Sequence, residues 1–344
     1  MVDAILEEID LRRSYLTETV ETIYFGGGTP SLLPPAAIGK ILEKLNDVFG
    51  IASNPEITLE ANPDDISMEQ LNGWRSAGIN RLSIGVQSFF EKDLTWMNRA
   101  HSATQATASI EAAQQHGFPN ITIDLIYGSP GLSDENWITN IERALQYQIP
   151  HISCYALTVE PKTALARMIA GDQFENTDPD MQARQFLLLV NRLKQAGYEH
   201  YEISNFALPG FRSRHNSSYW QGKPYLGLGP SAHSFDGKSR QWNIANNAIY
   251  LRAIGSGNIP AEAETLTETQ QVNEYLMTSL RTIEGISIEK IKTTWGNEKA
   301  TLLQTAVSKH QQRGYLSNND GQIVLTDTGK FLADGIAADL FFTE

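Results

Sequence analysis

Short apolar runs alternate with amphipathic segments over the first two thirds of the chain, and this alternation limits the possible folds more than any other feature. Chains that repeat strand and helix in this way form parallel sheets with right-handed crossovers. No G-x-G-x-x-G pattern follows the first predicted strand, which disfavours a Rossmann fold. We therefore predict an α/β fold built on a partial β/α barrel. The predicted strands are 22–25, 56–60, 81–86, 120–127, 151–157 and 198–203, and the predicted helices are 36–49, 67–77, 103–116, 134–147 and 180–196.

From Thr265 onward the pattern changes to helices followed by a hairpin. The hairpin surrounds the sequence Asn-Asn-Asp-Gly, which is a strong turn signal. This order is typical of a winged-helix-like α+β module. We divide the chain into a barrel core (1–210), a loop-rich segment (211–260) and this C-terminal module (261–344). Within the module the predicted helices are 267–281, 287–294, 298–313 and 328–340, and the predicted hairpin strands are 314–316 and 322–325.

The charge and the cysteine content exclude several classes of function. The net charge of -13 gives a surface that repels phosphate, so we expect no nucleic-acid partner even for the winged-helix-like module. No apolar run is long enough to span a bilayer, and the N-terminus lacks the apolar stretch of a signal peptide. We expect a cytoplasmic protein without a transmembrane segment, and peripheral contact with a membrane stays open. Cys154 is the one cysteine, so the chain can form no internal disulfide.

Polar residues follow the predicted strands at the edge where β/α barrels carry their chemistry. Three glycines precede Thr29, Glu60 ends the second strand, Gln87 follows the third, and Asp124 lies within the fourth. The glycines could form only a tight turn, and Glu60 could cap a helix. A carboxylate inside an apolar strand is costly unless it is paired or neutral. Two such carboxylates and an amide at one barrel mouth predict a small-molecule site, without naming the ligand.

A second group of candidate residues follows the sixth predicted strand. His215, Tyr219, Trp220 and His233 lie here among several glycines. One interpretation is a surface loop with an aromatic anchor and locally bonded histidines. The other is a ligand site, because aromatic side chains suit a flat apolar ligand and histidine is a common protein ligand of heme iron.

Four segments together resemble the radical S-adenosylmethionine proteins of the oxygen-independent coproporphyrinogen III oxidase-like family. They are 24–31 (YFGGGTPS), 60–63 (EANP), 83–88 (SIGVQS) and 124–128 (DLIYG). Their order and spacing match over nearly the whole chain, and the C-terminal module matches too. The resemblance implies an S-adenosylmethionine site formed by Gly27, Gly28, Thr29, Glu60, Gln87, Arg99, Asp124, Ala156 and His233.

Within that family, the segment 215–220 (HNSSYW) resembles the H-N-x-x-Y-W motif of the heme-chaperone branch. The resemblance implies a protein that binds heme and passes it to apo-hemoproteins such as respiratory cytochromes. His215 would be the axial ligand of the iron, with Tyr219 and Trp220 against the macrocycle and Asn216 beside them. One alternative is an oxygen-independent coproporphyrinogen III oxidase. Another is an ordinary β/α-barrel lyase or hydrolase that uses Glu60 and Asp124 as acid and base.

The family's C-x-x-x-C-x-x-C motif, which holds a [4Fe–4S] cluster ahead of the glycine segment, is missing here. One thiol cannot hold such a cluster, which needs several thiolates. By analogy with the family, we expect that about 30–45 residues are absent upstream and that the cluster belongs to the longer protein only. A native mass of 38.2 kDa would contradict this expectation. Without a cluster electron, this chain would not cleave S-adenosylmethionine reductively.

Overall fold

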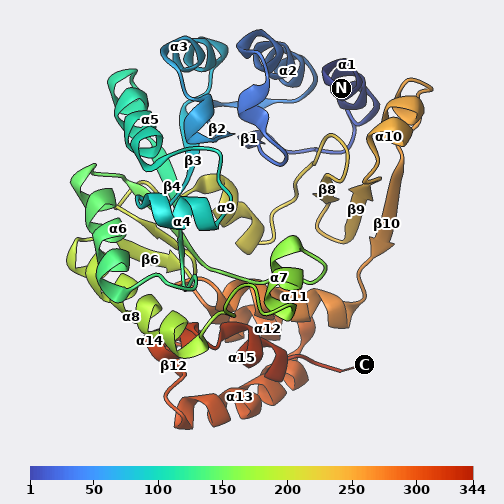
Figure 1. The fold of residues 1–344 in the computed structure, drawn as a ribbon. Coiled ribbons are helices and arrows are strands. Elements are labelled where there is room, and N and C mark those ends of the chain that lie inside the picture. The colour runs from blue at the N-terminus through green and yellow to red at the C-terminus, as the bar shows by residue number, and fades with distance from the viewer. Residues whose placement is uncertain (344) are drawn as a thin grey trace.

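The computed structural model describes residues 1–343, and its centre is a curled seven-stranded sheet that forms an open half barrel. The strands lie in the order β1-β2-β3-β4-β5-β7-β6, and β1 to β5 pair in parallel, which confirms the predicted α/β architecture. Helices cover the outer face of the sheet (Figure 1). The strands are β1 (Val20–Phe25), β2 (Ile51–Ala61), β3 (Arg81–Gln87), β4 (Ile121–Tyr127), β5 (His151–Ala156), β6 (Glu199–Glu202) and β7 (Asn205–Ala207).

All five helices predicted for the barrel are present, each within one residue of its predicted ends. Ser67 caps α3 by accepting a hydrogen bond from the Gln70 N–H (3.2 Å), and Gly78 ends it in the left-handed conformation (φ 110°), as predicted. The helices are α1 (Val2–Leu11), α2 (Pro35–Val48), α3 (Met68–Ala77), α5 (Ala103–Gln115), α6 (Asp134–Gln146) and α8 (Pro179–Gln195), with the short α4 (Glu91–Trp96) and α7 (Ala164–Ala170) between them.

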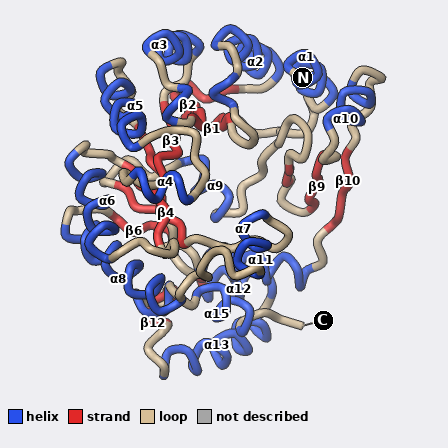
Figure 2. The backbone as a smooth tube through the Cα atoms, viewed as in Figure 1, coloured by secondary structure: helices blue, strands red, loops and turns tan. Residues whose placement is uncertain are grey.

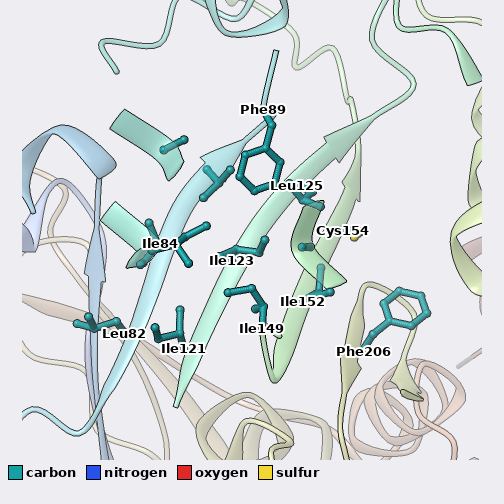
Figure 3. Packing of buried hydrophobic residues seen from close by; sticks show 14 of the residues in the cluster. Leu82, Ile84, Phe89, Ile121, Ile123, Leu125, Ile149, Ile152, Cys154 and Phe206 are labelled. Atoms are coloured by element: carbon teal, nitrogen blue, oxygen red, sulfur yellow. The ribbon is translucent and has the colours of Figure 1, made fainter. Parts of the chain in front are cut away.

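The two faces of the sheet differ in chemistry. On the convex face, apolar side chains pack against the helices (Figure 3). Alternate residues point to the concave face, and the strand register places polar side chains there in neighbouring strands. Parallel sheets are usually apolar on both faces, so this polar concave face indicates a solvated or ligand-binding interior. The concave face carries Tyr24, Thr58, Glu60, Arg81, Ser83, Thr122, Asp124, His151 and Ser153.

The sixth predicted strand differs from the structure. Instead of one strand beside β5, the chain makes β6, turns at Ile203 and Ser204, and returns as β7, which pairs antiparallel with both β5 and β6. The Glu202 carboxylate closes this turn by accepting hydrogen bonds from the Ser204 N–H (3.0 Å) and the Asn205 amide (2.6 Å). A three-residue strand is too short to give a periodic signal, which is why the sequence pattern missed β7.

The segment 211–260, predicted to be rich in loops, contains regular structure. The strand β10 pairs with β9 and so continues this segment beyond residue 260. The helix α9 lies beside β1 and the three-stranded sheet lies across the opening of the half barrel (Figures 1 and 2). The elements are α9 (Arg214–Trp220), β8 (His233–Phe235), β9 (Ser239–Asn243), α10 (Asn247–Ile254) and β10 (Ala261–Thr265).

The C-terminal module has its own apolar core and a three-stranded sheet in the order β11-β13-β12. The predicted hairpin is confirmed, with Asp320 (φ 53°) and Gly321 (φ 87°) at its turn. The last predicted helix is instead two, because a turn closed by the Leu332 N–H and the Gly329 carbonyl (2.9 Å) interrupts it. The elements are α11 (Glu268–Leu280), β11 (Ile286–Ser287), α12 (Ile288–Trp295), α13 (Asn297–Gln312), β12 (Leu316–Asn319), β13 (Gln322–Leu325), α14 (Asp327–Lys330) and α15 (Ala333–Asp339).

Within residues 1–343, none of the helices combines the length and the apolar composition that crossing a bilayer requires.

Candidate functional site

The glycine loop after β1 and the Glu60 carboxylate form one side of the barrel mouth. Gly27 (φ 74°) and Gly28 (φ 57°) have left-handed backbones that favour glycine. The Glu60 carboxylate accepts hydrogen bonds from the Gly27 N–H (3.1 Å) and from the Tyr24 hydroxyl (2.7 Å). Thr29 follows and precedes a short 3-10 turn. The glycine backbone is exposed, so a ligand can approach it closely.

The side chains of Gln87 and Arg99 meet above Gly85 in β3. An ideal Cβ at Gly85 would lie 3.0 Å from the Gln87 Nε2 and 3.3 Å from an Arg99 terminal nitrogen. Arg99 also donates to the Asn62 side-chain oxygen (3.2 Å). Glycine at 85 therefore leaves room for an amide and a guanidinium at the mouth. Asn62 directly follows β2 within the segment 60–63, and the resemblance did not include it in the S-adenosylmethionine site.

Asp124 lies partly exposed in the middle of the concave face. Loss of hydration raises the pKa of its carboxyl to about 7, and the Glu60 charge adds to this rise. The Arg81 guanidinium and a hydrogen bond with Ser153 act in the opposite direction. Asp124 therefore exchanges a proton near neutral pH, as a carboxyl held ready for a polar or cationic ligand would.

The remaining two residues of the predicted S-adenosylmethionine site are placed differently from each other. Ala156 ends β5 and pairs with Tyr127 at the end of β4, so it lies on the same edge of the sheet as Asp124. His233 lies in β8, outside the half-barrel sheet, and its exposed ring is 6.4 Å from that of Trp242. Arg99 lies beside Gln87, whereas His233 comes from the facing sheet. The other seven residues of the predicted site lie on the main sheet or its loops: Gly27, Gly28, Thr29, Glu60, Gln87, Asp124 and Ala156.

The half-buried His215 lies on α9 against the concave side of β1. Its ring stacks on Tyr24, with 4.7 Å between the ring centroids, and its Nδ1 is 3.0 Å from the Thr22 hydroxyl. Its Nε2 is 3.1 Å from the Tyr219 hydroxyl. The start of α9 is fixed because the Glu56 carboxylate accepts hydrogen bonds from the N–H groups of Arg214 (3.1 Å) and His215 (2.9 Å).

Burial lowers the pKa of His215 to about 4, and the nearby Arg81 charge contributes. The imidazole is therefore neutral at physiological pH, and a neutral ring nitrogen can bind a metal. The Thr22 hydroxyl can accept the Nδ1 proton, which would leave the Nε2 lone pair toward Tyr219. Tyr24 joins the two groups of residues, because its hydroxyl contacts Glu60 while its ring contacts His215.

Trp220 does not share the face of α9 that carries His215 and Tyr219. Residues four apart lie on the same side of a helix, whereas five residues turn it by about 140° from the start. The Trp220 ring packs under the Arg281 guanidinium (5.1 Å) and lines a cavity of about 390 Å³ beside the C-terminal module. Asn216 contributes its N–H to the Ser213 cap of α9 (3.2 Å). Trp220 and Tyr219 thus have different neighbours in this structure, and their joint contact with one macrocycle stays a prediction.

The residues of this chain do not fit a [4Fe–4S] cluster. Such a cluster is held by several thiolates, and the single Cys154 is buried on the helix-facing side of β5. We derive no step of a reaction through a cluster for this chain.

Residues 2–144 match the Radical SAM superfamily, and residues 266–332 match the HemN C-terminal domain. The chain is 34% identical over 339 residues to the heme chaperone HemW of Mycobacterium tuberculosis, an alignment that covers 98% of this chain and 85% of that protein. The chain belongs to the HemW family. HemW of Bacillus subtilis is 32% identical over 319 residues, covering 92% of this chain and 84% of that protein.

Among solved structures, coproporphyrinogen III oxidase (HemN) from Escherichia coli, described as a radical SAM enzyme, superimposes with a TM-score of 0.82. It is 23% identical, and the superposition covers 98% of this chain and 82% of that chain. This likeness shows that the HemW-family chain and HemN share a fold, including the half barrel and the C-terminal module.

Proposed function

We propose that this chain binds heme and passes it to apo-hemoproteins such as respiratory cytochromes. The observation that carries the proposal is the neutral His215 imidazole, stacked on Tyr24 at the side of a polar barrel interior. The name of its HemW relatives agrees with such a role. A chaperone has to release its ligand, and a single histidine on a short helix suits reversible binding.

His215 would bind the iron through Nε2. The Thr22 hydroxyl, 3.0 Å from Nδ1, would orient the ring and fix the tautomer, as partners of metal-binding histidines commonly do. The iron would replace the Tyr219 hydroxyl at Nε2. The Tyr219 ring, which is 39% exposed, would then lie at the edge of the macrocycle.

Titration of the protein with hemin, followed at the Soret band, tests this proposal. The wild type should bind hemin, and His215→Ala should weaken binding by about tenfold or more, since a metal–ligand bond is lost. His116→Ala is the matched control, because this histidine ends α5 and contacts a backbone carbonyl outside the site. Equal affinity in wild type and His215→Ala would contradict the assignment of His215.

We further propose that the barrel mouth binds S-adenosylmethionine, which in a radical enzyme supplies the 5′-deoxyadenosyl group. The exposed glycine backbone would receive its methionine part, and Glu60, Gln87, Arg99 and Asp124 would bind its amino and ribose groups, with Ala156 and His233 near the adenosine. Equilibrium dialysis should show Glu60→Gln about tenfold weaker than wild type, since a charged hydrogen bond is lost. Glu69→Gln, on the exposed side of α3, should bind as the wild type does.

The alternative function, oxidation of coproporphyrinogen III, has a direct test. The protein is incubated anaerobically with coproporphyrinogen III, S-adenosylmethionine and a reductant, and decarboxylated product is measured. We expect none, because this chain has one cysteine and cannot hold the cluster that would donate the electron. Product formation would favour the oxidase.

A further inference from the structure

Arg81 is a buried guanidinium on the concave face that has almost no partners. The side chain begins β3 and is 1% exposed, and its Nε and one terminal nitrogen make no hydrogen bond. Its cross-strand neighbour Thr58 is 0% exposed, and the Thr58 hydroxyl is also without a partner. Two adjacent residues thus leave polar atoms unsatisfied at the same place on the floor of the half barrel.

The carboxylates of the neighbouring strand β2 are engaged elsewhere. Glu56 accepts hydrogen bonds from the start of α9, and Glu60 accepts them from Tyr24 and Gly27. Within residues 1–343, no carboxylate oxygen lies within ion-pair distance of Arg81. The Asp124 carboxyl is the charged group that Arg81 influences, but the two form no ion pair. A buried guanidinium that leaves two nitrogens without a hydrogen bond is costly in free energy. Its presence at this position indicates a function that the ligand-free protein does not show.

The position of Arg81 relates it directly to His215. The strand register places Tyr24, Thr58 and Arg81 side by side on the concave face of β1, β2 and β3. Adjacent strands lie about 4.8 Å apart, so Arg81 is about 10 Å from Tyr24 across the sheet. His215 stacks on Tyr24. Thr58 and Arg81 are buried, so a ligand held at His215 could extend over them only after the groups that cover them move.

We propose that Arg81 binds a propionate carboxylate of the heme whose iron His215 binds. This inference rests on the proposed function. Arginine binds carboxylates through paired N–H donors, and the Thr58 hydroxyl can donate to the same group. Because Arg81 is 1% exposed, the groups around it have to move when heme enters, and α9 is the candidate because His215 holds it against the same concave face. This short helix has no fully buried residue of its own, so its displacement exposes little apolar surface.

The test compares hemin with hemin dimethyl ester, whose propionates carry no charge, in the same mild detergent. The wild type should bind hemin about tenfold more tightly than the ester, since the ester cannot form the charged pair. Arg81→Met should bind the two ligands equally, at the affinity of the wild type for the ester. Arg81→Lys, which keeps the charge but loses the paired donors, should retain part of the preference and serves if Arg81→Met does not fold.

Each other outcome overturns the inference. Equal binding of hemin and ester by the wild type would show that no propionate is recognised. Equal weakening of both ligands in Arg81→Met would show a structural role only. If the wild type binds hemin but does not prefer it over the ester, the proposed heme site stands without Arg81. If the wild type binds no hemin, the proposed function itself fails.

Discussion

The chain contains two buried arginines with opposite surroundings. Arg12, 4% exposed, joins α1 to β9: it donates to Glu8 (2.9 Å), Gln241 (3.1 Å) and Asn243 (2.7 Å). Arg81, 1% exposed, leaves two of its nitrogens without a partner. At similar burial, Arg12 forms hydrogen bonds that connect two elements of the fold, whereas Arg81, on the concave face of the half barrel, leaves nitrogens without a hydrogen bond. The difference teaches that burial alone does not separate structural charges from charges that serve a ligand.

Replacing each arginine by methionine should give the largest difference in stability between the two sites. Arg12→Met leaves the Glu8 carboxylate buried without its cation and should lower the free energy of unfolding by about 3–5 kcal/mol. Arg81→Met removes a buried charge that makes no ion pair, so its stability should be within about 1 kcal/mol of the wild type or higher. Chemical denaturation of the ligand-free proteins measures both values. A loss at Arg81 as large as that at Arg12 would contradict a ligand role for Arg81.

A second effect should appear in the pH dependence of stability that Asp124 confers on the same concave face. Its carboxyl has a pKa of about 7 in the folded protein, against about 3.9 for an unfolded chain. The folded state therefore holds more protons between these values, and the free energy of unfolding falls as pH rises from about 4 to about 7. Asp124→Asn should lack this decrease, so its stability relative to wild type should rise over that range and level off above it. Parallel curves would show that the folded carboxyl titrates normally.

Sequence periodicity predicts the elements that carry a repeating pattern, and it fails where burial depends on distant contacts. The strands, the Ser67 cap and the Asp320–Gly321 hairpin follow from local residue types. Glu60 and Asp124 were found because carboxylates interrupt apolar strands. Arg81 was missed because arginine at the start of a strand resembles a surface residue. Arg81 is buried in the barrel interior, which α9 borders although it lies far along the chain. The residue pattern of β3 gives no sign of this burial.

Trp220 shows a related limit within one motif. Six consecutive residues suggest one binding surface, yet the helical turn sends Trp220 toward Arg281 while His215 and Tyr219 face β1 and the loop beside it. The motif indicates which residues are candidates for binding. The helix geometry shows which of them lie on the same face and can contact one ligand.

The smallest predicted effect concerns the contact that heme would replace. The Tyr219 hydroxyl lies 3.1 Å from the His215 Nε2, and iron has to displace it. Tyr219→Phe keeps the ring and removes the competing hydrogen bond, so hemin affinity should increase by about fivefold, equivalent to about 1 kcal/mol. Tyr147→Phe, on the outer helices, should leave it unchanged. A decrease in Tyr219→Phe would indicate that the hydroxyl supports bound heme.

Rescue of His215→Ala by imidazole tests the central claim most directly. Hemin is added to the variant and to His116→Ala, and the Soret band is followed while free imidazole is titrated. We predict that His215→Ala has a weakened and shifted band and that imidazole restores the wild-type position, because the added ring occupies the vacated space beside Tyr24 and Thr22. A wild-type spectrum in His215→Ala before any imidazole is added would contradict the account.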